Sequence, residues 1–428
     1  MFRPKDLRQQ ADAIRDSLRK RGASTAVLDK ALEIDEERRD VIEEVESLRN
    51  RRNEASEKIG ELKREDRHEE ADELIEEMGE LKDSIESLSE RRDELDEKLE
   101  DGLLRIPNVL DDTVPPGEDE SDNRTEATYG DLPEWDFDPE PHWDLAEENG
   151  YASFEEAQKI SGARFAVQHK DGARLERALI NFMLDIQTDE NSYEETTTPF
   201  LVRPETMRGT GQLPKFEEDM YRTEDDGLYL IPTSEVSLIN LYADRILEPD
   251  QLPVRKTAWT ACFRREAGAH GKDTRGLMRQ HQFNKIELVQ VTKPENSDEA
   301  LEGLLEDART ILERLELPHR VVTLCAGDTG FAAARTYDLE VWVPSQDRYR
   351  EISSCSNCRG FQARRAGIQY RPDPEADAQY CHTLNGSGIA VGRCWLAILE
   401  NFQNPDGSVT IPDALRPYLD GRSTLDGS

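Results

Sequence analysis

Two long segments with a sustained apolar period constrain the fold of this chain more than any other feature. Residues 26–64 and 71–103 place apolar side chains at alternating steps of four and three residues. This stripe consists of Val41, Val45, Leu48, Ala55, Ile59 and Leu62, and then of Ala71, Leu74, Met78, Leu81, Ile85, Leu88, Leu95 and Leu99. A narrow stripe of this period is buried by pairing with another one. The sequence therefore predicts an antiparallel coiled-coil hairpin over about 26–103, ~50–60 Å long at about 1.5 Å per residue.

The composition changes after the hairpin. Pro115-Pro116-Gly117 interrupts helical structure, and residues 111–150 carry 15 acidic side chains against one basic side chain, which is typical of a linker and solvated loops. Because a chain of 428 residues allows two to three domains, we expect an N-terminal domain, 1–110, that contains the hairpin. The second domain is expected at 111–428, with a linker at its start.

The second domain contains many strand-like runs with few helices between them. A helical period runs through 172–188, and strand-like runs follow at 196–202, 228–232, 257–264, 282–291, 339–343 and 349–354. This order favours a mainly antiparallel sheet flanked by helices, an α+β fold. No stretch matches the pattern G-x-x-x-x-G-K-[ST], so a phosphate site must be built in another way.

The net charge of the chain is extreme. It has 92 acidic and 55 basic residues, a formal charge of −37. As a bulk number, this charge argues against a nucleic-acid partner. The acidic excess is spread along the chain, however, which favours a surface adapted to concentrated salt over an acidic tail. We therefore predict a halophile's protein, in which anion binding would depend on local basic clusters.

The cysteine pattern and the hydropathy predict a cytoplasmic protein. The six cysteines do not form the framework of a small disulfide-rich secreted fold. Cys355 and Cys358 form one C-x-x-C without a second pair at zinc-ribbon spacing, so we expect ordinary cysteines and no structural zinc, with a metal site as the alternative. No run approaches the roughly 18 apolar residues of a membrane span, and no signal peptide opens the chain.

A basic cluster stands out in this acidic sequence. Two strands joined by a Gly-rich loop would place its arginines beside Phe283 and glutamate side chains. Guanidinium groups suit phosphate, a phenyl ring suits a base, and a carboxylate suits an amine. The alternative interpretation is a salt-bridged β-hairpin. The cluster consists of Arg264, Arg265, Lys272, Arg275, Arg279 and Lys285.

A second segment, 382–393, is rich in small residues and ends in Arg393. We expect Gly386-Ser387-Gly388 to open a helix near whose start Arg393 lies, because a closely packed helix N-terminus with an arginine suits an anion. A Gly-rich turn before a tightly packed helix is the alternative. His382 is expected to be structural.

Together these motifs resemble those of class II aminoacyl-tRNA synthetases. F-R-x-E at 263–266, R-Q-H-Q-F at 279–283 and G-x-G-x-x-x-G-R at 386–393 resemble motifs 2 and 3 of that class, and 198–205 resembles motif 1, which builds a dimer interface. The signatures at 233–235, 336–342 and 351–357, and the N-terminal hairpin, are similar to those of bacterial-type seryl-tRNA synthetases. The resemblance covers essentially the whole chain.

The resemblance implies an ATP site with Mg²⁺. Arg264 would hold the α-phosphate and the serine carboxylate, Phe283 would stack on adenine, and Arg393 would take the γ-phosphate. Glu351 and Ser354 would position Mg²⁺. The implied ATP-binding residues are Arg264, Arg265, Glu266, Arg279, Phe283, Glu351, Ile352, Ser353, Ser354 and Arg393.

The resemblance also implies a serine pocket, in which Glu287 is the candidate for reading the hydroxyl. Buried polar groups discriminate a small hydroxyl substrate best, because apolar analogues leave them unpaired. With Glu287, Arg264 and Arg393 are the expected catalytic residues. The implied serine-binding residues are Thr233, Ser234, Glu235, Arg264, Glu287, Asn385 and Ser387.

The implied reaction has two steps and needs no protein nucleophile. The serine carboxylate attacks the α-phosphate of ATP, forming seryl-adenylate and pyrophosphate, and the terminal ribose hydroxyl of tRNA(Ser), with tRNA(Sec) as a further acceptor, then attacks the activated carbonyl. Catalysis would come from positioning of the reactants and from charge neutralisation. The resemblance also implies a homodimer. The implied tRNA-binding residues are Arg49, Arg51, Arg52, Lys58 and Arg64.

One departure and two rival interpretations remain. Arg359-Gly360 stands where the family commonly has an acid before Phe361, which leaves the local loop contact open.

An amino acid:carrier ligase would adenylate serine without charging tRNA, but the long hairpin argues against it. A non-enzymatic coiled-coil scaffold would leave the sequence after residue 190 unexplained.

Overall fold

The computed structural model describes residues 1–267 and 275–427, and the chain divides into two compact units. The first unit consists of residues 1–19 and 23–107, and the second of residues 20–22 and the chain from Asn108 onward. Within the described ranges, no helix is both long and apolar enough to cross a membrane.

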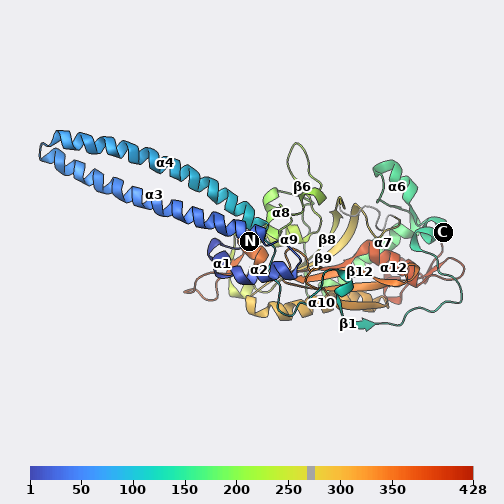
Figure 1. Ribbon diagram of the computed structural model, residues 1–428. Helices are drawn as coiled ribbons and strands as arrows, with labels where there is room; N and C mark the ends of the chain where they lie inside the picture. The colour runs from blue at the N-terminus through green and yellow to red at the C-terminus, as the bar shows by residue number, and fades with distance from the viewer. Residues whose placement is uncertain (268–274, 428) are drawn as a thin grey trace. The chain divides into compact units, whose positions relative to one another are not determined.

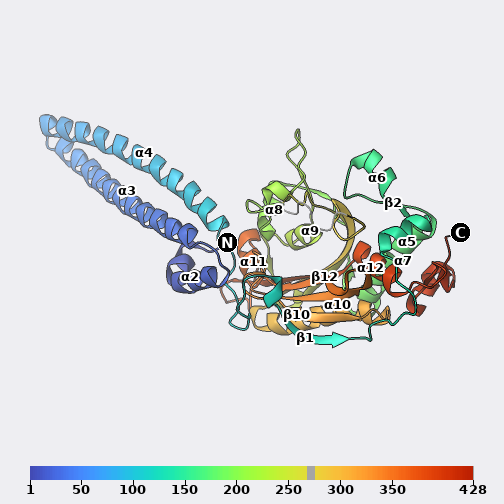
Figure 2. The same ribbon diagram turned by 45° about the vertical axis from the view of Figure 1, so that its right-hand side comes forward.

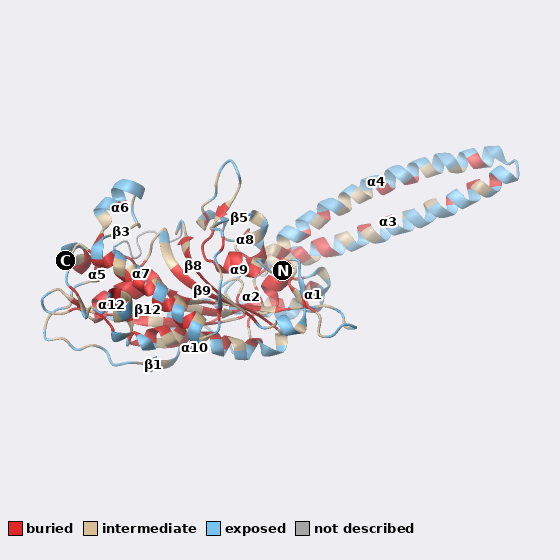
Figure 3. Cartoon of the chain, turned by 180° about the vertical axis from the view of Figure 1, so that it is seen from behind, coloured by how far each residue is buried: buried red, intermediate tan, exposed pale blue. Residues whose placement is uncertain are grey.

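The first unit contains the predicted hairpin. Helices α3 (Ala26–Arg64) and α4 (His68–Leu104) lie side by side along their length, after the short helices α1 (Pro4–Gln9) and α2 (Ala11–Lys20) (Figure 1). The predicted stripe is the buried seam between them, and the rest of both helices is largely exposed (Figure 3). The prediction of a coiled-coil hairpin is therefore confirmed. Within the predicted stripe, the most buried residues are Val45, Leu62, Ala71, Leu95 and Leu99.

The second unit is built on an eight-stranded sheet with the strand order β1-β10-β11-β12-β15-β9-β8-β4. Every neighbouring pair is antiparallel except β4 and β8, so the predicted α+β class with a mainly antiparallel sheet is confirmed. The strands are β1 (Arg124–Tyr129), β10 (His319–Thr323), β11 (Arg335–Val343), β12 (Arg348–Asn357), β15 (His382–Ala390), β9 (Gln282–Thr292), β8 (Val254–Phe263) and β4 (Glu194–Glu195).

Three long helices cover the sheet and form its core. Helix α10 packs on β12 and β15, α12 on β9 and β11, and α7 on β8 and β9. Their apolar side chains and those of the strands form one buried cluster that includes the fully buried Trp395. The helices of this unit are α5 (His142–Glu148), α6 (Phe154–Ser161), α7 (Lys170–Asp185), α8 (Pro204–Thr210), α9 (Glu235–Asn240), α10 (Ser297–Arg314), α11 (Phe361–Ala366) and α12 (Val391–Asn401).

Short two-residue strands complete the unit, and they correct two of the predicted strands. Of the runs at 196–202 and 228–232, only β5 (Leu201–Val202) and β6 (Tyr229–Leu230) pair, with each other rather than in the main sheet. The remaining short strands are β2 (Ala152–Ser153), β3 (Val167–Gln168), β7 (Ile246–Leu247), β13 (Gln369–Tyr370), β14 (Gln379–Tyr380), β16 (Val409–Thr410) and β17 (Thr424–Leu425).

The prediction that Gly386-Ser387-Gly388 opens a helix is wrong. These residues lie inside β15, and α12 begins only at Val391, with Arg393 in its first turn. A Cβ atom on Gly386 would lie 2.3 Å from Cδ2 of Leu304. The glycine therefore allows α10 to pack closely on the sheet, and its role is in packing rather than in a helix N-terminus.

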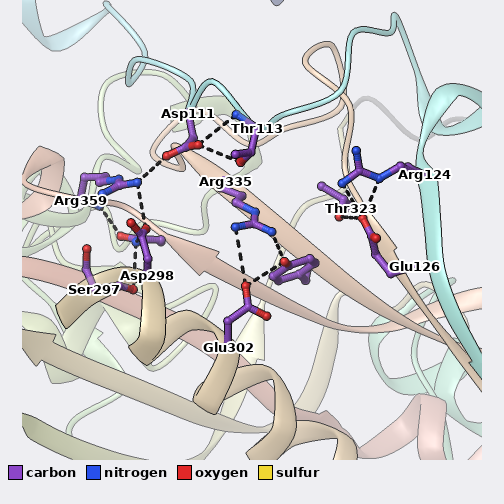
Figure 4. A network of polar contacts seen from close by, with 12 residues as sticks. Asp111, Thr113, Arg124, Glu126, Ser297, Asp298, Glu302, Thr323, Arg335 and Arg359 are labelled. Carbon is purple, nitrogen blue, oxygen red and sulfur yellow. Dashed lines mark hydrogen bonds and ion pairs between the residues drawn. The ribbon is translucent and has the colours of Figure 1, made fainter. Parts of the chain in front are cut away.

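Arg359, the departure from the family pattern, has well-defined partners. Its guanidinium pairs with Asp111 and, at 2.9 Å, with Asp298 of α10 (Figure 4). Its backbone N–H donates to Oδ1 of Asn357 at 2.8 Å. Arg359 thus joins the start of the second unit to α10 and to the end of β12, which answers the open question about the local loop contact.

Candidate active site

The central strands place the predicted functional residues on adjacent positions. Strands β8 and β9 form the predicted antiparallel pair, with Cys262 opposite Phe283, and β15 lies on the other side of β9, with Ser387 opposite Glu287. Because side chains alternate along a strand, Phe283, Lys285 and Glu287 project from the same face of β9. The sheet therefore brings residues more than 100 positions apart in the sequence to one face.

A hollow opens beside these strands. It brings together seven predicted nucleotide residues with Ser387 of the predicted serine set, whereas Arg265, Ser353 and Ser354 do not line it. Its wall offers a phenyl ring, two carboxylates and three guanidinium groups. The lining residues are Arg264, Glu266, Leu277, Met278, Arg279, Gln280, Phe283, Lys285, Glu351, Ile352, Ser387, Ala390, Gly392 and Arg393.

The three arginines of the hollow differ in their partners. Arg393 donates to the Glu351 carbonyl at 2.6 Å and lies 3.4 Å from its carboxylate, and Arg279 pairs with Glu266 at 3.1 Å. Arg264 lies 5.1 Å over the Phe283 ring and donates from Nε to the Pro232 carbonyl at 3.3 Å. Among the described residues, no carboxylate forms an ion pair with Arg264. Its guanidinium is therefore the best placed of the three to receive an anion.

A buried polar cluster adjoins the hollow through Lys285. Nζ of Lys285 donates to Oγ1 of Thr233 at 2.9 Å and pairs with the Glu287 carboxylate, and the Thr233 hydroxyl donates to Oε2 of Glu287 at 3.0 Å. All three side chains are at most 8% exposed. Hydrogen bonds between such buried polar groups are costly to leave unmade, so this cluster can discriminate a small polar substrate.

Glu235, at the start of α9, joins the same cluster. Its Oε1 accepts hydrogen bonds from Nε2 of Gln362 at 2.5 Å and from Nδ2 of Asn385 at 2.9 Å. Burial and the nearby Glu287 carboxylate raise the pKa of Glu235 to about 7, although Gln362, Lys285 and Arg264 favour its charged form. Ser234 beside it is fully buried, and Ser353 donates to the Ser387 carbonyl at 2.5 Å.

The residues predicted to hold Mg²⁺ lie on β12. Glu351 lines the hollow, and Ser354 forms a hydrogen bond with Asp338 of β11. Burial and the nearby Glu351 raise the pKa of Asp338, whose Oδ1 is buried without a hydrogen-bond partner in the described part of the chain. Carboxylate and hydroxyl oxygens are donors that Mg²⁺ accepts beside substrate phosphates, so these residues fit the ion. The described residues contain no group of three or more His, Cys, Asp or Glu side chains that could hold a metal, so the ion would depend on the phosphates as further ligands.

Other predicted residues lie elsewhere, and two contributors had not been assigned. Arg265 is exposed and Arg275 pairs with Asp144 at 3.0 Å, while Lys272 lies outside the described residues.

Lys285 was part of the basic cluster, and its two-residue spacing from Phe283 and Glu287 could have placed it in the site. Gln362 carries no such signal, because it enters from α11.

The predicted tRNA-binding residues all lie on α3 of the first unit. Arg49, Arg51, Lys58 and Arg64 are exposed, and Arg52 is half-buried near the seam. Their side chains therefore point largely to solvent, as contact with an external anion requires.

Comparison with protein families gives two matches. Residues 1–110 match the seryl-tRNA synthetase N-terminal domain, and residues 215–402 match the tRNA synthetase class II core domain (G, H, P, S and T). The first covers the hairpin, and the second covers Arg264, Phe283, Glu351 and Arg393.

Individual relatives resemble the chain over nearly its whole length. A serine--tRNA ligase of Thermotoga petrophila is 56% identical over 412 residues, 96% of this chain and 97% of the relative, and one of Staphylococcus haemolyticus is 52% identical over 98% and 97%. The crystal structure of seryl-tRNA synthetase from Pyrococcus horikoshii complexed with ATP matches with a TM-score of 0.93 and 36% identity over 100% of this chain and 99% of that one. With this similarity and the two domain matches, the chain belongs to the seryl-tRNA synthetase (serine--tRNA ligase) family of class II synthetases.

Proposed function

We propose that this chain attaches L-serine to tRNA(Ser) through a seryl-adenylate made from serine and ATP. The observation that carries the proposal is the continuity of the two parts of the site. Arg264 lies in the hollow over Phe283, and Lys285 lines the same hollow while it bonds Thr233 and Glu287 of the buried cluster. A nucleotide in the hollow and a small amino acid at the cluster would therefore meet at Arg264.

In the first step, Arg264 would bridge the α-phosphate and the serine carboxylate, and Arg393 would bind the γ-phosphate. Phe283 would stack on adenine, with Glu266 at its amino end. Glu287 would read the serine hydroxyl. Glu351 and Ser354 would hold Mg²⁺, which supplies charge neutralisation on the phosphate oxygens. Fixed charges in a partly enclosed site stabilise the developing negative charge without reorganisation.

In the second step, we infer that domain 1–110 binds the tRNA through Arg49, Arg51, Arg52, Lys58 and Arg64. The match of this segment to the seryl-tRNA synthetase N-terminal domain supports that assignment. We further propose that the chain also serylates tRNA(Sec) and that it forms a homodimer. We propose a cytoplasmic, halophilic setting for it. In molar salt the Debye length is only about 3 Å, so the acidic surface would scarcely repel tRNA phosphates.

The experiment compares serine, threonine and alanine in ATP–pyrophosphate exchange and in tRNA charging across a potassium chloride series. We expect exchange and charging with serine only, and retention of activity in molar salt. Exchange without charging of any tRNA would instead identify an amino acid:carrier ligase. Loss of activity as salt rises from low to molar would contradict the halophilic setting.

A further inference from the structure

Gln362 is a fully buried side chain whose amide connects three elements around the serine cluster. It is the second residue of α11, which packs on α8, and α8 packs on α9 (Figure 2). Nε2 of Gln362 donates to Oε1 of Glu235 at 2.5 Å and to the Thr210 carbonyl at 3.3 Å. Its Oε1 accepts a hydrogen bond from the Thr383 hydroxyl at 2.7 Å.

These partners allow only one orientation of the amide. Glu235 and Thr210 both present oxygen acceptors, so the side of the Gln362 amide that faces them must carry the NH₂ group. The Thr383 hydroxyl then donates to the remaining oxygen. The amide is therefore locked, and both of its protons are directed at fixed acceptors.

The Glu235 carboxylate is held from one side. Gln362 and Asn385 both donate to its Oε1, and no hydrogen bond of the described residues is made to its Oε2. Other charged or titratable groups face it from each neighbouring element. They are Lys285 and Glu287 of β9, Arg264 after β8 and the Cys358 thiol before α11.

We propose that Gln362 is a positioning residue that directs the Glu235 carboxylate toward the substrate and favours its charged form, so that it binds the ammonium group of the amino acid. This inference rests on the proposed function. Burial and Glu287 disfavour the carboxylate form of Glu235, and Gln362 is first among the groups that favour it. Without this donor, the carboxyl would hold its proton at neutral pH and would lose its attraction for a cation.

The test measures serine and ATP KM values in pyrophosphate exchange between pH 6 and pH 9. Gln362→Met keeps much of the side-chain volume and removes both donors and the acceptor. A hydrogen bond to a charged group is worth about 1.5–3 kcal/mol, so we expect the serine KM at pH 7 to rise by roughly 10–150-fold. The ATP KM should stay the same, and the loss should shrink toward pH 9 as Glu235 ionises.

Gln187→Met is the matched control, because Gln187 is also fully buried and donates to a backbone carbonyl, that of Asp307, at 2.9 Å. It lies outside the site, so we expect its KM values and pH profile to match the unmodified protein. A pH-independent loss in Gln362→Met, or an equal rise of both KM values, would overturn the role of Gln362. No serine-dependent exchange by the unmodified protein would instead refute the proposed function.

Thr383→Val provides a second variant if Gln362→Met does not fold. It removes the hydrogen bond to Oε1 of Gln362 but leaves both donors of the amide in place. We expect a smaller, few-fold rise in the serine KM with the same recovery at high pH. An unchanged serine KM across the whole pH range would contradict the proposal.

Discussion

The hairpin and the candidate active site use the same charged residue types in opposite ways. On the hairpin, Arg51 pairs with Glu77 at 3.1 Å, with side chains that are 58% and 48% exposed. In the site, Lys285 pairs with Glu287 where both side chains are at most 8% exposed. The charged groups of the hairpin stay hydrated, whereas those of the site are buried and are stabilised by one another.

This difference predicts how each region responds to substitution. Exposed pairs contribute about 0–1 kcal/mol each, because water and salt screen them. Buried charged groups are costly to leave unpaired, so the loss of one partner changes the charge state and the geometry of the others. Stability of the hairpin should therefore depend on its seam, and function of the site on single polar contacts.

The largest effect is expected for Arg264→Ala, because no ion pair within the described residues competes for this guanidinium. We expect pyrophosphate exchange to fall on the order of 10³-fold, as for the loss of a donor to a developing anion. Arg264→Lys should recover only part of this loss, since a lysine lacks the bidentate fork. Arg222→Ala, an exposed arginine over Tyr229, is the control. Unchanged exchange in Arg264→Ala would refute the catalytic assignment.

Leu95→Ala tests the seam of the hairpin. Leu95 is 1% exposed, so its truncation should destabilise the hairpin by about 2–4 kcal/mol through lost burial and a residual cavity. Thermal unfolding followed by circular dichroism measures the effect. Ile75→Ala on the same helix is the control, because Ile75 is 43% exposed and should change stability little. Equal destabilisation by both variants would contradict the seam as the source of stability.

Glu235→Gln tests the cost of the buried charge. The folded-state pKa of Glu235 is raised to about 7, above the ordinary carboxyl value near 4.3, so its protonated form favours folding at low pH. That stability is lost as the pH rises toward 7, by at most about 4 kcal/mol. The melting temperature of Glu235→Gln relative to the unmodified protein should therefore rise between pH 5 and pH 8. The exposed Glu195→Gln should show no such trend, and a trend of the same size there would assign the effect to net charge.

The same contrast explains how much could be predicted from the sequence. The apolar residues of the seam, which alternate at steps of four and three up to Leu99, form a pattern between sequence neighbours. The hairpin could therefore be predicted nearly to its ends at Arg64 and Leu104. The strand pair that carries Phe283 could be predicted because alternation is also local. Gly386 was wrongly predicted to open a helix. Its small size is needed for close packing against Leu304, which lies in a helix 82 residues away in the sequence. Gln362 could not be assigned, since its partners come from three elements that only the tertiary fold brings together.

The smallest effect on stability, and the sharpest test of the hairpin's role, is expected for Arg51→Ala and Glu77→Ala. Both variants break the same exposed pair, so each should change the free energy of unfolding by less than about 1 kcal/mol. Their effects on tRNA binding should have opposite signs. Removal of Arg51 deletes a cation that can contact phosphate, which should weaken binding and lower the salt slope of log K by about one. Removal of Glu77 frees that cation and should strengthen binding at low salt, whereas equal effects of both variants would place the tRNA elsewhere on the molecule.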